Sequence, residues 1–349
     1  MKIVKYLFFL LLIVVIGSSI YFGTQDGNYN IAESKIIPAP AELVFDQIND
    51  LRTAENWGPW KAEDSTMTFS YAEKTSGEGA SYSWEGVMDG AMTTTKVIPN
   101  KEILQDLTLH TPVGERHPKV YWTFEETEEG TKATYGMKGE HTLVDKAFYG
   151  IFGYDFDKEM HKMNATALIG VENEVLTAMK QFEVNVDGIT QYGGGFYMYN
   201  TTATKMSDIA SKMVPMMGQV SNFMEQNGLA FSGMPFTIYH NIDEANGNVM
   251  FSTAIPVREK ITTPAGSPVL CGYMAPVAAL KTTLRGSYEN LAAAYAAGAA
   301  YMTENNLQAH PTSSMFEVYA SDPGMEPNPA KWVTEIYMPI ISPPTPTLN

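Results

Sequence analysis

Cysteine is almost missing from this chain, whose 349 residues include only Cys271. One thiol excludes an internal disulfide framework and any metal site that several cysteines would build. Histidine is also scarce, and its six copies show no HExxH pattern or other close spacing of metal ligands. The sequence therefore predicts neither a metal nor a cofactor.

Basic side chains are the second shortage: 23 Lys and Arg stand against 39 Asp and Glu, which gives a formal net charge of −16. Because Lys2 and Lys5 lie in an N-terminal apolar segment, the remaining body is more acidic still. Such a surface repels nucleic acid and anionic lipid and favours the approach of cations. We therefore expect no nucleic-acid partner, although solubility alone also accounts for an excess of acid.

The N-terminal apolar segment runs from Ile3 to Phe22 and is broken only by Lys5 and by Gly17-Ser18-Ser19. About twenty helical residues span the roughly 30 Å of a bilayer core. Lys2 precedes the run, Lys5 lies at its start and Asp26 follows it, so the positive-inside rule places the N-terminus in the cytoplasm. We expect residues 1–23 to be a single membrane anchor, with the body on the extracytoplasmic (periplasmic) side.

A cleaved signal peptide is the alternative to a retained anchor. The apolar run continues to Phe22, and no A-x-A cleavage pattern or lipobox cysteine follows it. These features favour retention, and either alternative takes the body out of the cytoplasm. With 44% apolar and 11% aromatic residues, that body has the composition of a folded protein and the length of about two domains.

The first domain is expected at residues 29–182 and reads as a strand, a short helix, a run of strands and a long helix. Pro40 suits the first turn of the short helix, and Glu129-Gly130 marks a hairpin turn. The long helix carries apolar residues every three or four positions from Phe156 to Phe182, and Gly170 inside it allows close packing. The expected strands are 29–37, 66–73, 80–88, 91–98, 102–109, 119–125 and 131–140. This order predicts an α+β, helix-grip arrangement, in which an antiparallel sheet wraps a long C-terminal helix.

Two motifs in this domain carry a resemblance to a known family. "WGPW" (Trp57 to Trp60) follows the short helix, and "GEGASYSWEG" (Gly77 to Gly86) covers one strand. With these motifs, residues 29–182 resemble the START-like, polyketide-cyclase (SRPBCC) superfamily. The resemblance implies a hydrophobic cavity between sheet and helix. Tyr82 and Trp84 share one face of their strand and are candidate ligand-binding residues there, although a place in the ordinary core explains them equally well.

The second domain contains an internal repeat. "FMEQNGLAFSGMPFTIYH" (Phe223 to His240) is echoed by "YMTENNLQAHPTSSMFEVYA" (Tyr301 to Ala320) about 80 residues later. Apolar strands follow both, "VMFSTAIPV" and "WVTEIYMPI", and a strand and a helix precede both. The preceding strands are expected at 195–200 and 277–284, and the helices at 206–226, where Pro215 starts a second segment, and 288–304. Two copies of strand–helix–strand–strand predict a duplicated, pseudo-twofold domain.

The repeat, together with "RGSYENL" (Arg285 to Leu291), "EVYASDP" (Glu317 to Pro323) and "TEIYMPI", resembles the GyrI-like effector-binding domain of AraC- and MerR-type regulators. The resemblance covers 190–342, which leaves 343–349 as a tail. We expect the two domains to separate near Asp187 to Gly195, where the long helix has ended and a glycine run begins. The resemblance implies that drug-like molecules bind in an aromatic cleft between the two copies, with a glutamate on the last strand. Such regulators carry a helix-turn-helix unit, whereas here an anchor and a START-like domain occupy that place.

Glu335 falls at the position of that glutamate, in an otherwise apolar strand. A carboxylate on the floor of an aromatic cleft suits a lipophilic cation, because the cation offsets its desolvation and contacts the aromatic faces. We expect the ligand-binding residues to be Glu335, Tyr337, Tyr319, Tyr239 and Tyr199.

The favoured function is a membrane-anchored extracytoplasmic protein that binds a hydrophobic or cationic small molecule as a sensor, carrier or sink. Two alternatives remain open at this point. The GyrI-like resemblance also implies a small-molecule hydrolase, in which Glu335 and a tyrosine would serve as acid–base partners. A protein–protein interaction module of the envelope would need neither cavity. No catalytic residue is assigned, and the sequence favours a binding protein over an enzyme.

Overall fold

The computed structural model describes residues 2–111, 114–321 and 323–341, and divides the chain into two compact units, Met1–Ala178 and Met179–Asn349. The division comes earlier than the boundary expected near Asp187 to Gly195. Strand β9 (Glu183–Tyr192) pairs along its length with β14 (Val277–Arg285), so it belongs to the second sheet. The expected tail, 343–349, lies outside the described residues.

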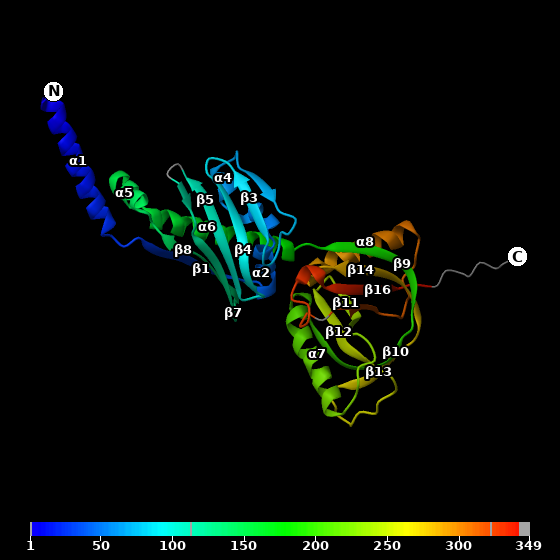
Figure 1. Ribbon diagram of the computed structural model, residues 1–349. Coiled ribbons are helices and arrows are strands. Elements are labelled where there is room, and N and C mark those ends of the chain that lie inside the picture. The colour runs from blue at the N-terminus through cyan, green and yellow to red at the C-terminus, as the bar shows by residue number, and fades with distance from the viewer. Residues whose placement is uncertain (1, 112–113, 322, 342–349) are drawn as a thin grey trace. The chain divides into compact units, whose positions relative to one another are not determined.

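The N-terminal helix α1 (Lys2–Gly23) contains the one helix segment, among the residues described, that is long and apolar enough to cross a membrane, Ile3–Gly23. Length and composition of this kind are shared by membrane spans and signal sequences. Most of its large apolar side chains are exposed, whereas Phe22 near its end is buried. Figure 1 shows α1 extending away from the sheet of the first unit.

The first unit is built on one antiparallel sheet with the strand order β1-β8-β7-β5-β4-β3-β2 and with β6 paired to β5. Its strands are β1 (Asn28–Ile37), β2 (Thr68–Tyr71), β3 (Ser81–Glu85), β4 (Asp89–Ile98), β5 (Glu102–Thr111), β6 (Gly114–Arg116), β7 (Lys119–Thr127) and β8 (Gly130–Glu140). Its helices after α1 are α2 (Ala41–Asn49), α3 (Ala54–Trp57), α4 (Trp60–Glu63), α5 (Leu143–Phe152) and α6 (Phe156–Met179). The order confirms the expected helix-grip arrangement.

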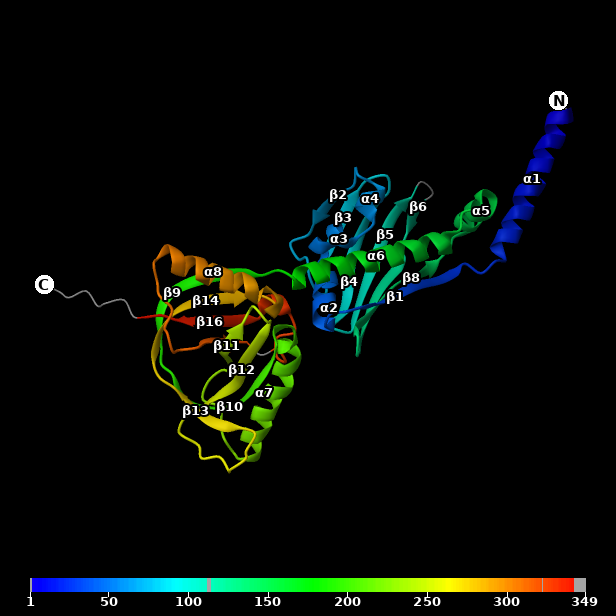
Figure 2. The same cartoon turned by 180° about the vertical axis from the view of Figure 1, so that it is seen from behind.

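The long helix α6 runs across the strands of this sheet (Figure 2). Its buried residues, such as Leu168 and Val171, form the core together with inward-facing strand residues such as Trp122. Gly170 lies directly against the backbone of Trp57, where a Cβ atom would overlap the carbonyl oxygen. The glycine therefore permits the close packing that was expected, in spite of its low helix propensity.

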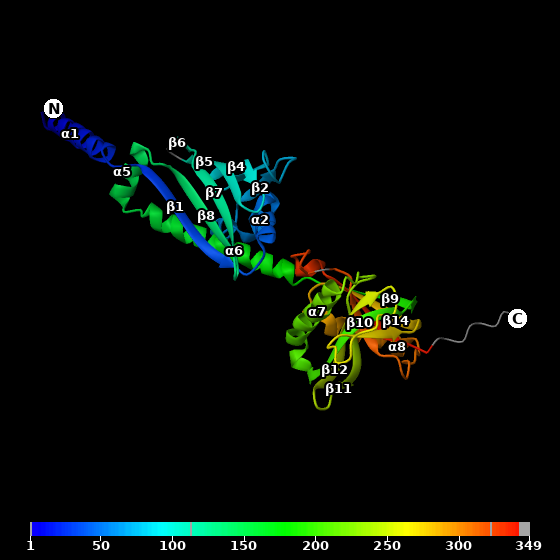
Figure 3. The same ribbon diagram turned by 90° about the horizontal axis from the view of Figure 1, so that it is seen from below.

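The second unit is one sheet with the order β13-β10-β12-β11-β15-β16-β14-β9. Its strands besides β9 and β14 are β10 (Gly195–Lys205), β11 (Phe236–Asp243), β12 (Asn248–Val257), β13 (Leu270–Met274), β15 (Met315–Tyr319) and β16 (Val333–Pro339). Helix α7 (Ile209–Gln226) lies beside β10 and β12 (Figure 3), and α8 (Leu291–Glu304) packs on β14 and β9. Each copy is strand–helix–strand–strand, as the repeat predicted.

The two copies meet where β11 pairs with β15. In the repeat, Phe236 corresponds to Phe316, so Thr237 corresponds to Glu317. The register pairs Thr237 directly with Glu317, and the flanking pairs Phe236↔Val318 and Ile238↔Phe316 are equivalent under exchange of the copies. The local twofold axis therefore passes through the Thr237–Glu317 pair.

Helix α7 differs from the expectation in one respect. Pro215 was expected to start a second helical segment, but it lies inside a continuous helix, Ile209–Gln226. Proline removes one backbone donor from a helix, which is tolerated most easily where the helix is loosely packed. The only residues of α7 that are buried are Val220 and Met224, in its second half, and Pro215 is exposed.

Candidate functional site

Glu317 and Tyr319 lie on the face of the second sheet that the helices cover. Alternation along β15 sends Phe316 and Val318 to the opposite face, where they join an apolar core cluster. On the helix face, Tyr295 of α8 reaches Glu317, and Met213 of α7 lies 3.1 Å from the hydroxyl of Tyr319. Both helices therefore help to enclose the side chains around Glu317, which lies at the local twofold axis.

The carboxylate of Glu317 is held by phenol groups. Its side chain is buried, with 1% of the residue exposed. The Tyr295 hydroxyl donates to Oε1 at 2.7 Å, the Tyr319 hydroxyl donates to Oε2 at 3.1 Å, and Tyr239 also hydrogen-bonds the carboxylate. Thr237, the repeat equivalent of Glu317, lies 2.9 Å from the Tyr319 hydroxyl. We call Glu317, Tyr239, Tyr295 and Tyr319 the axial cluster.

Burial governs the electrostatics of the axial cluster. Loss of solvent raises the pKa of Glu317, and the hydrogen bonds from the three tyrosines offset only part of this rise. Burial, and then the charge of Glu317, in turn raise the pKa of Tyr295 and Tyr319, so both hydroxyls remain protonated donors. Among the residues that the structure describes, no basic side chain contacts Glu317. Its negative charge therefore needs either a proton or a cation.

Glu335 lies on the opposite face of the same sheet and already has a cation. Lys281 Nζ lies 2.7 Å from its Oε1, and the Tyr337 hydroxyl donates to its Oε2 at 2.8 Å. The Glu335 and Lys281 side chains are 25% and 24% exposed, and Asp187 lies 3.9 Å from the same ammonium group. The geometry therefore gives Glu335 a compensated, partly solvated charge.

The residues predicted to surround Glu335 fall into two groups. Tyr337 and Tyr199 share its face and pack in the core cluster with Phe236 and Phe316. The rings of Phe316 and Tyr337 are stacked with centroids 4.8 Å apart. Tyr239 and Tyr319 lie on the helix face and surround Glu317 instead. Of the four predicted tyrosines, the structure thus places Tyr337 against Glu335. Tyr199 is on the same face but four strands away, on β10, and the other two tyrosines lie at a different carboxylate.

The two residues predicted to line a cavity in the first unit are core residues. Tyr82 and Trp84 are both buried, and the Trp84 ring nitrogen donates to the carbonyl of Met88 at 2.9 Å. The space that Tyr82 lines with Trp57, Trp122 and Tyr135 has a volume of about 10 Å³. That volume holds about one water molecule. In this structure Tyr82 and Trp84 therefore pack as buried core residues, and the space beside Tyr82 is too small for an organic ligand.

A second hollow, of about 360 Å³, lies at the β13 edge of the second sheet. It is lined by Phe196, Lys260, Cys271, Gly272 and Tyr273. Its charged lining residue is a lysine, which disfavours a cationic ligand. Within the described part of the chain, no group of three or more His, Cys, Asp or Glu residues is placed to hold a metal ion.

Glu317 and Tyr295 are site residues that the sequence analysis did not single out. Two signals pointed to Glu317: it is the one acid in the strand Met315–Tyr319, and the repeat pairs it with an uncharged threonine. Tyr295 lies within the helix expected at 288–304, and nothing in the sequence marked it as a site residue. Its meeting with Glu317 depends on how α8 packs on the sheet, which no local pattern specifies.

Comparison with known families concerns the first unit most directly. Residues 38–155 match the family described as "Activator of Hsp90 ATPase homolog 1-like protein". The match lies within residues 29–182 and confirms an SRPBCC-type domain there. Among curated proteins, none matches the chain.

Several solved structures are similar to parts of the chain. The C-terminal domain of EcmrR is 18% identical over 46% of this chain and 99% of that chain, with a TM-score of 0.40. EcmrR in a complex with DNA is 15% identical over 58% of this chain and 78% of that chain, also with a TM-score of 0.40. The Aha1 dimer from Colwellia psychrerythraea is 16% identical over 42% of this chain and 96% of that chain, with a TM-score of 0.32.

Proposed function

We propose that this protein is a membrane-anchored binding protein for an apolar, cationic small molecule, and that the ligand binds at the axial cluster. One observation carries the proposal: Glu317 is a buried carboxylate whose described contacts include three tyrosine hydroxyls and no basic group. Buried carboxylates usually have a paired cation, because desolvation penalises the isolated charge. A ligand cation would supply that partner.

The chemistry of the surrounding groups fits such a ligand. Tyrosine rings attract cations through their faces, by about 0.5–2 kcal/mol for each contact. The ligand would also convert Glu317 from a group with a raised pKa into an ionised partner, so binding favours release of its proton. A neutral molecule of the same shape would gain the apolar contacts without the ion pair.

Access to the axial cluster requires movement, because Glu317 is covered in this structure. The first half of α7 is the cover that is held most weakly: it contains no buried residue among 209–219, and Pro215 removes one of its backbone donors. Met213 in this half touches Tyr319. Segments with few buried apolar contacts open at low free energy. We therefore infer that the ligand enters by displacing the first half of α7.

The anchoring part of the proposal rests on α1. Ile3–Gly23 has the length and composition of a membrane span. Lys2 and Lys5 precede or begin this segment and Asp26 follows it, which by the positive-inside rule supports a body on the extracytoplasmic side.

The hydrolase alternative has weaker support. It requires Glu335 as an acid–base group, but Lys281 neutralises that carboxylate at 2.7 Å. Its nearest tyrosine partner, Tyr337, is two residues away on the same strand. This arrangement is typical of a structural ion pair rather than of a base that must accept a proton from a substrate.

The test compares two glutamate variants of the full chain in detergent micelles. Calorimetric titration uses phenyltrimethylammonium as the cation and tert-butylbenzene as its neutral isostere. We expect Glu317→Gln to weaken binding of the cation by about 1.5–3 kcal/mol, the range for contacts to a charged group, and to leave the neutral compound unaffected.

Glu335→Gln is the matched control, because it removes a carboxylate on the same sheet that Lys281 already neutralises. It is expected to change neither affinity. Equal losses for both compounds in Glu317→Gln would contradict a charge interaction. A loss of cation affinity in Glu335→Gln alone would place the site on the opposite face, where the sequence first predicted it.

A further inference from the structure

Helix α5 presents an apolar face to solvent. Phe148 is 50% exposed, Ile151 66% and Phe152 72%, and Leu143, Val144 and Tyr154 are exposed as well. Val144, Phe148 and Ile151 recur at helical spacing, so they form one stripe rather than scattered surface residues. Soluble surfaces seldom expose aromatic and aliphatic side chains together in this way.

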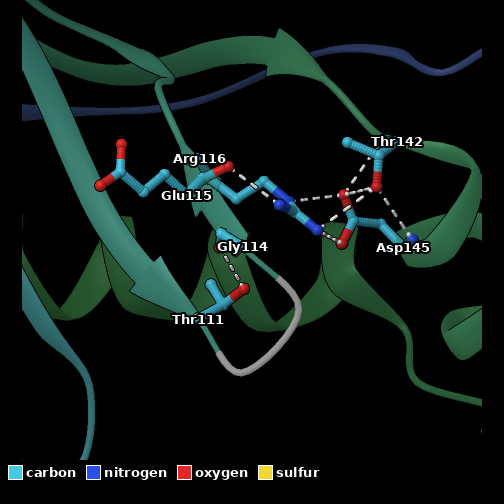
Figure 4. A network of polar contacts seen from close by, with 6 residues as sticks. All are labelled: Thr111, Gly114, Glu115, Arg116, Thr142 and Asp145. Carbon is cyan, nitrogen blue, oxygen red and sulfur yellow. Dashed lines mark hydrogen bonds and ion pairs between the residues drawn. The ribbon is translucent and has the colours of Figure 1, made fainter.

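The polar side chains of α5 lie on the side of the helix that packs against the rest of the first unit. Thr142 and Asp145 form a capping box, and Arg116 makes two hydrogen bonds to the Asp145 carboxylate, at 2.8 and 2.7 Å (Figure 4). Burial alone would raise the pKa of Asp145, but the Arg116 and Thr142 hydrogen bonds outweigh it and hold the pKa below its usual value. The charge is thus neutralised on the inner side, and the helix is fixed with its apolar stripe outward.

The same helix adjoins the end of α1. The ring of Phe22, which is buried, lies against Gly150, where a Cβ atom would come within 2.5 Å of it. Lys146 Nζ donates to the carbonyl of Gln25 at 2.8 Å. The contacts are on the side of α5 that carries Lys146 and Gly150, so they leave the stripe of Val144, Phe148 and Ile151 uncovered. Figure 1 shows α5 next to the C-terminal end of α1.

We propose that α5 is an interfacial membrane helix, whose face of Val144, Phe148, Ile151 and Phe152 inserts into the lipid headgroup region beside the anchor. The inference rests on the anchoring part of the proposed function. A span that ends at Gly23 places its C-terminal end at the membrane surface, and the helix that contacts this end lies at the same depth.

Lipid fits this face better than an acidic or basic partner would. The stripe contains no charged side chain, and the body as a whole is acidic, so attraction to anionic headgroups does not drive the contact. A ten-residue amphipathic helix with phenylalanine and isoleucine on one side inserts by burial of apolar area at the acyl boundary. The helix would also fix the orientation of the first unit on its anchor.

The experiment uses the full chain with Cys271→Ser and one new cysteine, at Ile151, Ile36 or Leu11, labelled with an environment-sensitive fluorophore in phosphatidylcholine vesicles. Ile36 is the matched control, because it is an exposed isoleucine of the same unit. It lies eight residues after Asn28, the first residue of β1, which is about 26 Å along the strand from the end nearest the anchor. Leu11 reports insertion of α1. Spin labels placed near the headgroup or near the end of the lipid chain quench each probe according to its depth.

The proposal predicts blue-shifted emission at position 151, quenched by the shallow spin label more than by the deep one, and neither effect at position 36. Quenching at 11 without quenching at 151 would overturn the interfacial helix and leave the anchor intact. A blue shift at 151 that neither spin label quenches would mean that protein, such as a second copy of the chain, covers this face, and would also overturn it. No deep quenching at 11 would refute the anchoring, and the inference with it, without bearing on ligand binding at Glu317.

Discussion

The raised pKa of Glu317 makes the stability of the second unit depend on pH, and Glu317→Gln removes this dependence. The side chain is buried, and loss of solvent outweighs the three tyrosine hydrogen bonds in setting its pKa. Glutamine keeps the shape and can still accept hydrogen bonds, but it does not ionise. The two proteins therefore differ mainly in one titrating group.

The sign follows from proton binding in the two states. Below the ordinary pKa of 4.5 the glutamate is protonated in both the folded and the unfolded chain, and there is no penalty. As pH rises above 4.5, the unfolded chain loses the proton while the folded chain keeps it, so stability falls. A difference of one proton corresponds to a slope of at most about 1.4 kcal/mol per pH unit. The fall continues until pH reaches the raised pKa.

Hydrogen exchange measured by mass spectrometry on the full chain in detergent resolves this effect, because peptides from β11 and β15 report on the second unit alone. Relative to Glu317→Gln, the parent should lose protection in these peptides at up to about 1.4 kcal/mol per pH unit above pH 4.5. Peptides from β7 and β8 serve as the internal control and should be unchanged by the substitution. Parallel pH curves for parent and variant would refute the reasoning, since they would mean that burial does not perturb this carboxyl group.

Three further expectations concern the first unit and the topology. Gly170→Ala should stabilise the helix by about 0.5–1 kcal/mol through its higher helix propensity, but it forces a Cβ atom onto the Trp57 carbonyl, and such overpacking costs about 1–3 kcal/mol. We therefore expect a lower Tm. A higher Tm would show that the backbone moves to accommodate the methyl group. Asp145→Asn should weaken protection of α5 by about 1.5–3 kcal/mol, because it removes a charged partner of Arg116. Since the pKa of Asp145 is lowered, this difference is present above pH 3.8 and should vanish as pH falls through the lowered value; persistence in strong acid would contradict the ion-pair explanation. Protease added to cells with a permeabilised outer envelope should degrade the body, whereas its protection would place the body in the cytoplasm.

The antiparallel sheet of the first unit was predictable because its signals are local. Strands β4, β5, β7 and β8 were expected within a few residues of their observed bounds, since alternation and turn residues mark each hairpin. The duplication of the second unit was equally visible, because two similar sequences fold into two similar structures. The pairing of Thr237 with Glu317 follows from that duplication once the copies are joined at β11 and β15.

Elements whose structure depends on a distant partner were not predictable in this way. Strand β9 was not among the expected strands, and the expected domain boundary fell inside it, because Gly188 and the glycines after Tyr192 indicate a break. Its pairing with β14 makes it a strand. Pro215 likewise appears as a break in the sequence, although the rest of α7 packs on β10 and β12 and holds the helix continuous. In both cases tertiary contacts outweigh local propensity.

By itself, the sequence determined that this protein has an apolar N-terminal segment, an acidic body, a first domain of strands closed by a long helix, and a duplicated second domain, because composition, periodicity and repetition specify each of these. The SRPBCC assignment of the first domain came from its resemblance to that family. It also determined that Glu317 and Glu335 lie on strands. Only the tertiary structure decided that Glu317 is enclosed by tyrosines while Lys281 neutralises Glu335. The physical reason is that alternation assigns a residue to one of two faces, whereas desolvation and ion pairing depend on which helices and strands pack against that face.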